Sequence, residues 1–192
     1  MAQLLNKPTD QRITLSGTWE HFKSIQQGFE NTPGAKLSYY EGTIEILMPG
    51  EDHEFSSRVI HYLVTTFLLK KGIQFKMTGS KTQEKEGAVS AQADESYCLG
   101  SSKPIPDLSI EIIFTSGGIN KLAKYQALGV PEVWFWQDGS LTLHHLRDRG
   151  YEGIERSELP GLEQLDIELL KRCILIAETD LSQAVQTFQQ NI

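Results

Sequence analysis

Two acidic residues on predicted strands, followed by two lysines on a predicted helix, could together do chemistry. Asp94 and Glu111 lie in apolar, alternating stretches that are typical of β-strands, and Lys121 and Lys124 follow after a glycine turn. If the two strands pair, two carboxylates and an ammonium group meet. Hard divalent cations such as Mg²⁺ are commonly held by one or two carboxylates plus substrate phosphate. A nearby lysine can orient or deprotonate an attacking water and offset charge on a phosphodiester, so the pattern predicts phosphodiester hydrolysis.

The same residues also have a purely structural interpretation. A glutamate on a buried strand needs a counter-charge, and an ion pair between Glu111 and either lysine would supply it without any catalysis. Helix geometry places Lys121 on one side together with Tyr125, while Lys124 lies between the two sides of the helix. We therefore expect Lys121 to be the active-site lysine and keep Lys124 as the alternative.

The strands and the helix that must position these residues can be read from their patterns. In extended form, one face of residues 106–114 carries Glu111 and the other face is wholly apolar, because side chains alternate along a strand. After the glycine turn, residues 119–128 predict a helix that a glycine ends. Upstream, residues 88–99 predict one continuous strand with Asp94 in its middle.

The remaining patterns predict interleaved helices and strands. Apolar residues at three-to-four spacing indicate a helix over 18–28 and a longer one over 53–71, which we expect Asp52 to cap. The apolar stripe of the longer helix consists of Phe55, Val59, Tyr62, Leu63 and Phe67. Further strands are predicted over 35–40, 43–48, 73–77, 132–136, 141–146 and 151–156. Residues 78–87 predict a turn or loop. This order favours an α/β (α+β) fold, with a mixed central sheet flanked by helices, over a sandwich or bundle.

Length and composition set limits on the kind of protein. The chain has 192 residues and a net charge of -7 at pH 7, which disfavours tight nonspecific binding to nucleic acid. Cys98 and Cys173 support neither a disulfide framework nor a zinc site. Without a signal-peptide core or an apolar run long enough to cross a bilayer, we expect a soluble, cytoplasmic protein. We expect a single domain over 1–192, with its core over 35–156 and a helical tail over 162–192.

Four segments taken together resemble the Uma2 family, also called domain of unknown function 820, which is abundant in cyanobacteria. They are ADESY at 93–97, PDLSIEI at 106–112, KLAKY at 121–125 and GVPEVWFW at 129–136. Members of this family are similar to the PD-(D/E)XK restriction-endonuclease-like superfamily. The resemblance runs from the hairpin near Tyr40 to about Tyr151. It implies a restriction-endonuclease-like core that carries an N-terminal helix and hairpin.

The resemblance also implies a Mg²⁺- or Mn²⁺-dependent endonuclease that acts on nucleic acid, with DNA favoured. The first metal-binding acid of the superfamily falls on Asp94 and the second on Glu111. The superfamily lysine would fall on Ile113, so the strict pattern is broken here. In Uma2-like sequences a lysine four residues before a tyrosine stands in for it, which is Lys121 ahead of Tyr125. Related nucleases are often dimers, so a homodimer is implied.

Three further residues are expected as accessory members of the site. The family often shows a histidine at the position of His53, which could contact phosphate or water; the alternative is a helix cap or surface residue. Glu45 could approach the metal from the same end, or lie on a solvated strand face. Asp107 shares a strand face with Glu111 and could be a further ligand, although we rank it below Asp94.

Two rival functions remain open at this point. One is a noncatalytic module that keeps the nuclease fold and acts as a dimeric scaffold or binding partner, which the displaced lysine and the acidic net charge favour. The other is a metal-dependent phosphatase for small phosphates, which would need a closed pocket instead of an open groove.

Overall fold

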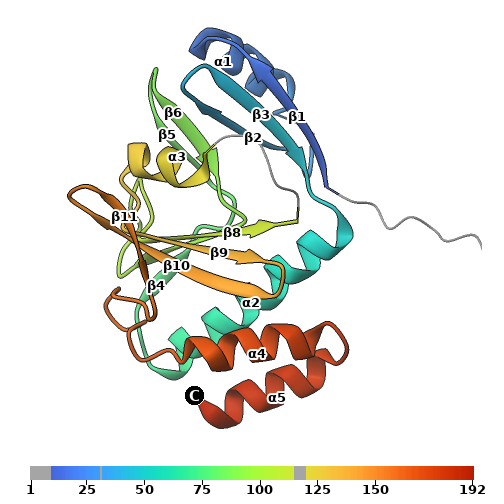
Figure 1. Cartoon of the computed structure of the whole chain (residues 1–192), viewed down its shortest axis with the longest axis vertical. Coiled ribbons are helices and arrows are strands. Elements are labelled where there is room, and N and C mark those ends of the chain that lie inside the picture. The colour runs from blue at the N-terminus through green and yellow to red at the C-terminus, as the bar shows by residue number, and fades with distance from the viewer. Residues whose placement is uncertain (1–9, 31, 115–119) are drawn as a thin grey trace, which may run out of the picture.

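The computed structural model describes residues 10–30, 32–114 and 120–192, which form two β-sheets and five helices (Figure 1). The strands are β1 (Gln11–Ser16), β2 (Lys36–Tyr40), β3 (Thr43–Met48), β4 (Phe75–Met77), β5 (Thr82–Lys85), β6 (Val89–Gln92), β7 (Glu95–Leu99), β8 (Leu108–Ile113), β9 (Glu132–Gln137), β10 (Ser140–Arg147) and β11 (Gly150–Ile154). The helices are α1 (Trp19–Gly28), α2 (Glu51–Lys70), α3 (Lys121–Leu128), α4 (Ile167–Ala177) and α5 (Leu181–Asn191). None of these helices is long and apolar enough to span a bilayer. The mixed α/β class is confirmed.

The N-terminal sheet has the strand order β1-β3-β2-β6-β5 and is antiparallel throughout. Helix α1 packs on it through Trp19 and Phe22, whose rings lie 5.3 and 5.6 Å from that of Tyr39. Thr18 caps this helix in a capping box with His21, which satisfies backbone groups of the first turn. The predicted first helix and the β2–β3 hairpin are therefore confirmed.

The second sheet has the order β11-β10-β9-β8-β7-β4. It is mixed, because β8 and β9 pair in parallel while the other neighbours pair antiparallel. A parallel pair needs a crossover, and α3 lies in the segment that joins β8 to β9. The Asn120 side chain caps α3 by accepting from the backbone N–H of Ala123 at 3.1 Å, and Gly129 ends the helix with φ +82°. The predicted start of this helix at residue 119 lies outside the described residues.

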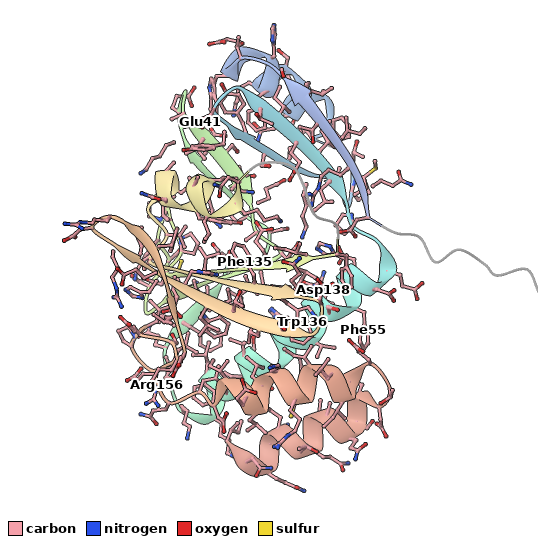
Figure 2. All side chains as sticks on the ribbon, in the orientation of Figure 1. Glu41, Phe55, Phe135, Trp136, Asp138 and Arg156 are labelled. Atoms are coloured by element: carbon pink, nitrogen blue, oxygen red, sulfur yellow. The ribbon has the colours of Figure 1, made fainter. Side chains whose placement is uncertain are left out.

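The second sheet has a hydrophobic cluster on each face. On one face Ile110 and Trp136 pack with α2, α4 and α5, and on the other Val133 and Phe135 pack with α3 and β6. Phe135 and Trp136 are neighbours on β9 and belong to opposite clusters, as strand alternation requires (Figure 2). Glu111 pairs with Phe135 in the parallel register, so its side chain lies on the α3 face.

Two predictions about the middle of the chain were wrong. The predicted loop over 78–87 contains β5, which pairs with β6. The predicted single strand over 88–99 is two strands, because β6 belongs to the N-terminal sheet and β7 to the second sheet. Glu95 is the one residue that interrupts the alternation of apolar and polar residues over 89–97, and a single acidic residue does not reveal a change of sheet. Asp94 therefore lies at the junction of the two sheets and not in the middle of a strand.

The long helix is confirmed, but two of its details differ from the prediction. Gly50 and not Asp52 is the N-cap residue of α2, which begins at Glu51. Phe55 and Tyr62 are exposed although the apolar stripe includes them. The buried face of α2 is rotated and consists of Val59, Ile60, Leu63, Val64, Phe67 and Leu68. That face packs against β8 and the C-terminal helices.

Candidate functional site

The predicted site residues gather where the two sheets meet. The break between β6 and β7 brings Asp94, β8 brings Glu111, α3 brings Lys121, and the first turn of α2 brings His53. In Figure 1, α3 lies between the N-terminal sheet and the second sheet. Four different parts of the chain thus position the buried polar groups of the site.

Asp94 is almost fully buried, and both of its carboxylate oxygens accept hydrogen bonds. Oδ1 lies 2.8 Å from Nε2 of His53 and also accepts from the ammonium group of Lys36. Oδ2 accepts from the backbone N–H of Ile112 at 2.5 Å, one residue beyond Glu111 on β8. Burial disfavours the ionised carboxylate, but His53, Lys36 and Lys121 outweigh burial and lower the pKa of Asp94.

His53 is held between two carboxylates. Its Nε2 faces Asp94, and its Nδ1 lies 2.9 Å from Oδ2 of Asp10. Burial disfavours the imidazolium, but Asp94 and Asp10 outweigh burial and raise the pKa of His53. Because both ring nitrogens are engaged, this geometry leaves neither of them for phosphate or water. The imidazole orients Asp94 instead.

Glu111 is buried beneath α3. Its Oε2 accepts from the ammonium group of Lys121, its Oε1 accepts from the hydroxyl of Tyr125, and Nζ of Lys124 lies 3.7 Å from Oε1. Burial raises the pKa of Glu111, but the charges of Lys121 and Lys124 outweigh burial and lower it. The charge of Asp94 acts in the opposite direction on this pKa, which places the two carboxylates within electrostatic reach of each other.

The two lysines of α3 differ in their electrostatics. Burial opposes the charge of Lys121, but Glu111 and Asp94 outweigh burial and raise its pKa. Burial dominates at Lys124, whose pKa is lowered, and the charge of Lys121 acts in the same direction. Lys121 is therefore the firmly charged lysine of the site, and Lys124 is the one that gives up a proton more readily.

The remaining accessory candidates lie in different places. Glu45 is buried, with Oε2 3.5 Å from Nε of Arg12, and its charge acts on both lysines of α3. Asp107 is not brought to the site. It precedes β8, about 13 Å along the strand from Glu111, and accepts from the backbone N–H of Leu99 and from Lys103, each at 2.7 Å.

Sequence reasoning missed two residues that the fold brings to the site. Lys36 reaches Asp94 across 58 sequence positions, and Asp10 reaches His53 across 43. Strand alternation could have placed Lys36 on one face of the β2 strand, but nothing distinguished it from a surface lysine. Asp10 directly precedes β1, and no motif in the sequence marks it as a site residue.

The donor set at Asp94 and Glu111 fits a hard divalent cation of the magnesium type. Both ligands would be carboxylate oxygens from neighbouring segments, since Asp94 accepts from the backbone N–H of the residue that follows Glu111 on β8. Within residues 10–30, 32–114 and 120–192 there is no group of three or more histidine, cysteine or acidic side chains arranged to hold a metal. Two carboxylates suit an ion that keeps several waters and shares substrate phosphate, and do not suit a closed zinc or calcium cage.

The architecture is a mixed α/β fold that a solved structure shares. The chain is similar to a crystal structure described as "a putative nuclease belonging to DUF820", from Anabaena variabilis ATCC 29413. The TM-score is 0.58 over 82% of this chain and 98% of that chain, with 16% sequence identity. At this identity the likeness shows the fold alone.

The chain belongs to the Uma2 family. The family profile, described as "Putative restriction endonuclease", matches residues 19–174. The resemblance that the four sequence segments suggested is thereby confirmed. No curated protein matches the sequence.

Proposed function

We propose that this protein is a metal-dependent endonuclease that hydrolyses phosphodiester bonds in nucleic acid, with DNA as the favoured substrate. One observation carries the proposal: Asp94 accepts from the backbone N–H of Ile112, the residue after Glu111, and Lys121 hydrogen-bonds to Glu111. Two carboxylates with an adjacent ammonium group are the parts that such a reaction needs. The family description of a restriction endonuclease supports the same class of reaction.

The residues have separate roles in this proposal. Asp94 and Glu111 hold Mg²⁺ or Mn²⁺, which when bound offsets negative charge and makes a water more acidic. Lys121, whose pKa is raised, stays charged and stabilises the negative charge that develops on the phosphate. Lys124, whose pKa is lowered, is the better proton acceptor for the attacking water. His53 and Asp10 fix the orientation of the Asp94 carboxylate.

Nicking of supercoiled DNA in a titration with Mg²⁺ or Mn²⁺ tests the proposal. We expect the wild-type protein to cut, and Asp94→Ala and Glu111→Ala to abolish cutting. Asp107→Ala is the matched control, because it removes a carboxylate that the fold keeps away from the site, and it should keep activity. If the wild-type protein cuts DNA and RNA no better than the Asp94 and Glu111 variants, the enzymatic proposal fails.

A second candidate function, a homodimeric scaffold, is favoured by an apolar surface around α2. Phe55, Tyr62 and Leu69 are 38%, 47% and 66% exposed and lie seven residues apart, so they share one face of the helix. Met77 of β4 and Leu181 of α5 are also exposed, and Leu181 shares a groove with Phe55 and Tyr62. Figure 2 shows Phe55 on the side of α2 away from the N-terminal sheet. Grouped exposed apolar residues mark interaction surfaces.

A second copy of this chain fits the α2 surface. If two α2 helices meet antiparallel around Tyr62, across a two-fold axis perpendicular to both helices, Phe55 of one copy faces Leu69 of the other. The same register places Glu54 opposite Lys70, so charges as well as apolar groups are complementary. The surface is therefore complementary to itself.

Sedimentation velocity tests the homodimer. We expect the wild-type protein to sediment as a dimer and Tyr62→Glu to sediment as a monomer, because the substitution places two carboxylates at the centre of the interface. Ile13→Glu is the matched control on an exposed apolar residue of β1 and should leave the dimer intact. A monomeric wild-type protein at micromolar concentration, or a dimeric Tyr62→Glu, would rule out this surface.

A further inference from the structure

Lys36 is a member of the site that neither the sequence patterns nor the family resemblance assigns. Its ammonium group extends from β2, in the N-terminal sheet, and donates to Oδ1 of Asp94. The Lys36 side chain is 16% exposed, whereas that of Asp94 is 2% exposed. Lys36 thus connects the buried carboxylate to solvent.

The hydrogen bonds of Asp94 leave little room for a further cation unless one donor moves. Oδ1 accepts from His53 and Lys36, and Oδ2 accepts from the backbone N–H of Ile112. The Ile112 donor is fixed in β8, and Asp10 anchors His53 at its other ring nitrogen. Lys36 has a flexible four-carbon stem and contact with solvent, so it is the donor that can leave.

The carboxylates of this region are already fully compensated by cationic side chains without a metal ion. Among the described residues, the carboxylates of this region are Asp10, Glu45, Asp94 and Glu111, and the cationic side chains are Arg12, Lys36, His53, Lys121 and Lys124. A divalent cation that entered alone would add uncompensated positive charge in a buried region, which is unfavourable. A phosphodiester that entered with the cation would offset part of this charge.

We propose that Lys36 is a phosphate-binding lysine, which neutralises Asp94 until a divalent cation and a phosphodiester enter together. This inference rests on the nuclease function proposed above. When the cation binds Asp94, the ammonium group of Lys36 is released within reach of the phosphate that shares the ion, and a lysine binds phosphate well as a point charge. Metal and nucleic acid then bind cooperatively, each tightening the binding of the other by the same factor.

Binding of Mn²⁺, measured by electron paramagnetic resonance of the free ion, tests this role without any turnover. The wild-type protein and Lys36→Met are each titrated with Mn²⁺ alone, and again with a phosphorothioate oligonucleotide, whose backbone is charged and resists hydrolysis. In the wild type we expect the oligonucleotide to tighten Mn²⁺ binding about 5- to 150-fold, the usual range for coupled sites. In Lys36→Met we expect tighter Mn²⁺ binding than in the wild type when no oligonucleotide is present, and little further tightening when it is added.

Two controls separate this role from a structural one. Lys103→Met removes a similar lysine–aspartate pair, with Asp107, outside the site, and should leave both Mn²⁺ titrations unchanged. If Lys36→Met folds poorly, Lys36→Gln, which keeps a polar side chain, takes its place and should give the result expected for Lys36→Met. Weaker Mn²⁺ binding by both folded Lys36 variants would show that Lys36 merely holds Asp94 in place, and would overturn the inference. If the wild type binds no Mn²⁺ even with the oligonucleotide, the proposed metal-dependent function itself fails.

Discussion

Replacing Asp10 should separate two contributions that one carboxylate makes to stability. Oδ1 of Asp10 accepts from the backbone N–H of Gly50, at the start of α2, at 2.8 Å, and Oδ2 contacts His53 at 2.9 Å. The first contact replaces a side-chain cap, which the N-cap residue Gly50 cannot supply itself. The second is a buried hydrogen bond between a carboxylate and an imidazole that favours the charged imidazole.

The magnitudes follow from the two contacts. A capping interaction contributes about 0.5–2 kcal/mol, and a hydrogen bond to a charged group contributes about 1.5–3 kcal/mol. Asp10→Ala loses both, so we expect the free energy of unfolding to fall by about 2–5 kcal/mol. Asp10→Asn keeps an oxygen for Gly50 and loses only the charge opposite His53, so we expect a loss of about 1–2 kcal/mol.

The pH dependence provides the sharper distinction. Because the pKa of His53 is raised in the folded protein, its contribution to stability is fully present below its unfolded pKa of about 6.5. That contribution is lost as the pH rises through the folded pKa. Asp10→Asn removes one of the two carboxylates that raise this pKa, so the variant should lose less stability than the wild type between pH 6 and pH 9.

Urea unfolding followed by circular dichroism at pH 6 and pH 9 measures these differences. The wild type, Asp10→Ala and Asp10→Asn are compared at each pH under conditions where unfolding is two-state. If Asp10→Ala is no less stable than Asp10→Asn, the capping argument is wrong. If Asp10→Asn shows the same pH dependence as the wild type, the electrostatic argument about His53 is wrong.

Four further predictions concern other buried charges. Lys121 stabilises charge on the phosphate in the proposed reaction, so Lys121→Met should lower the DNA cleavage rate about 10²- to 10³-fold. It should also move the rise of the pH–rate profile to higher pH, because the charge of Lys121 lowers the pKa of Lys124. A general base works in its neutral form, so the wild-type rate should rise with pH through the lowered pKa of Lys124, and Lys124→Met should flatten this rise. The pKa of Asp94 is lowered, so its contribution to stability is present above its unfolded pKa of about 3.9 and is lost as the pH falls through the folded value. The melting temperature of Asp94→Asn should therefore change less with pH below pH 5 than that of the wild type, and an equal change in both proteins would contradict this. Glu132 is buried and accepts from an indole, an imidazole and a backbone N–H at 2.6–3.1 Å; Glu132→Gln should lower the free energy of urea unfolding by about 1–3 kcal/mol, and a wild-type value would refute its structural role.

The parts of the site that are local in sequence could be predicted. Glu111 and Lys121 are ten positions apart, on a strand and on the helix that follows it along the chain, so alternation and helix geometry could bring them together. Their contact is confirmed by the structure. The mixed sheet was predictable for the same reason, since strand, helix and strand follow one another directly along the chain.

The contacts between distant segments could not be predicted. Asp94 was predicted to be a site acid. Its place between β6 and β7 depends on which sheet each of these two strands joins, and the pattern of apolar and polar residues does not show this. Lys36 and Asp10 reach the site only after the N-terminal sheet has packed beside the second one. The exposure of Phe55 and Tyr62 on α2 was not predicted, because a stripe of apolar residues does not show how far the helix is rotated against its sheet.

The position of the site at a junction of sheets explains how so many charges can be buried together. Interior strands satisfy each other's backbone hydrogen bonds, but the ladder that β7 makes on β8 ends at Ile110, whose carbonyl accepts from the backbone N–H of Asp94 at 3.1 Å, so a polar group must satisfy the N–H of Ile112 beyond it. The Asp94 carboxylate does so by accepting from Ile112 of β8, and its other oxygen accepts hydrogen bonds from His53 and Lys36. Ion pairs of this kind contribute little to stability compared with well-packed apolar residues. A cluster that burial penalises at every member has little to contribute to stability, and the proposed binding of a cation and a phosphate would give its charges a function.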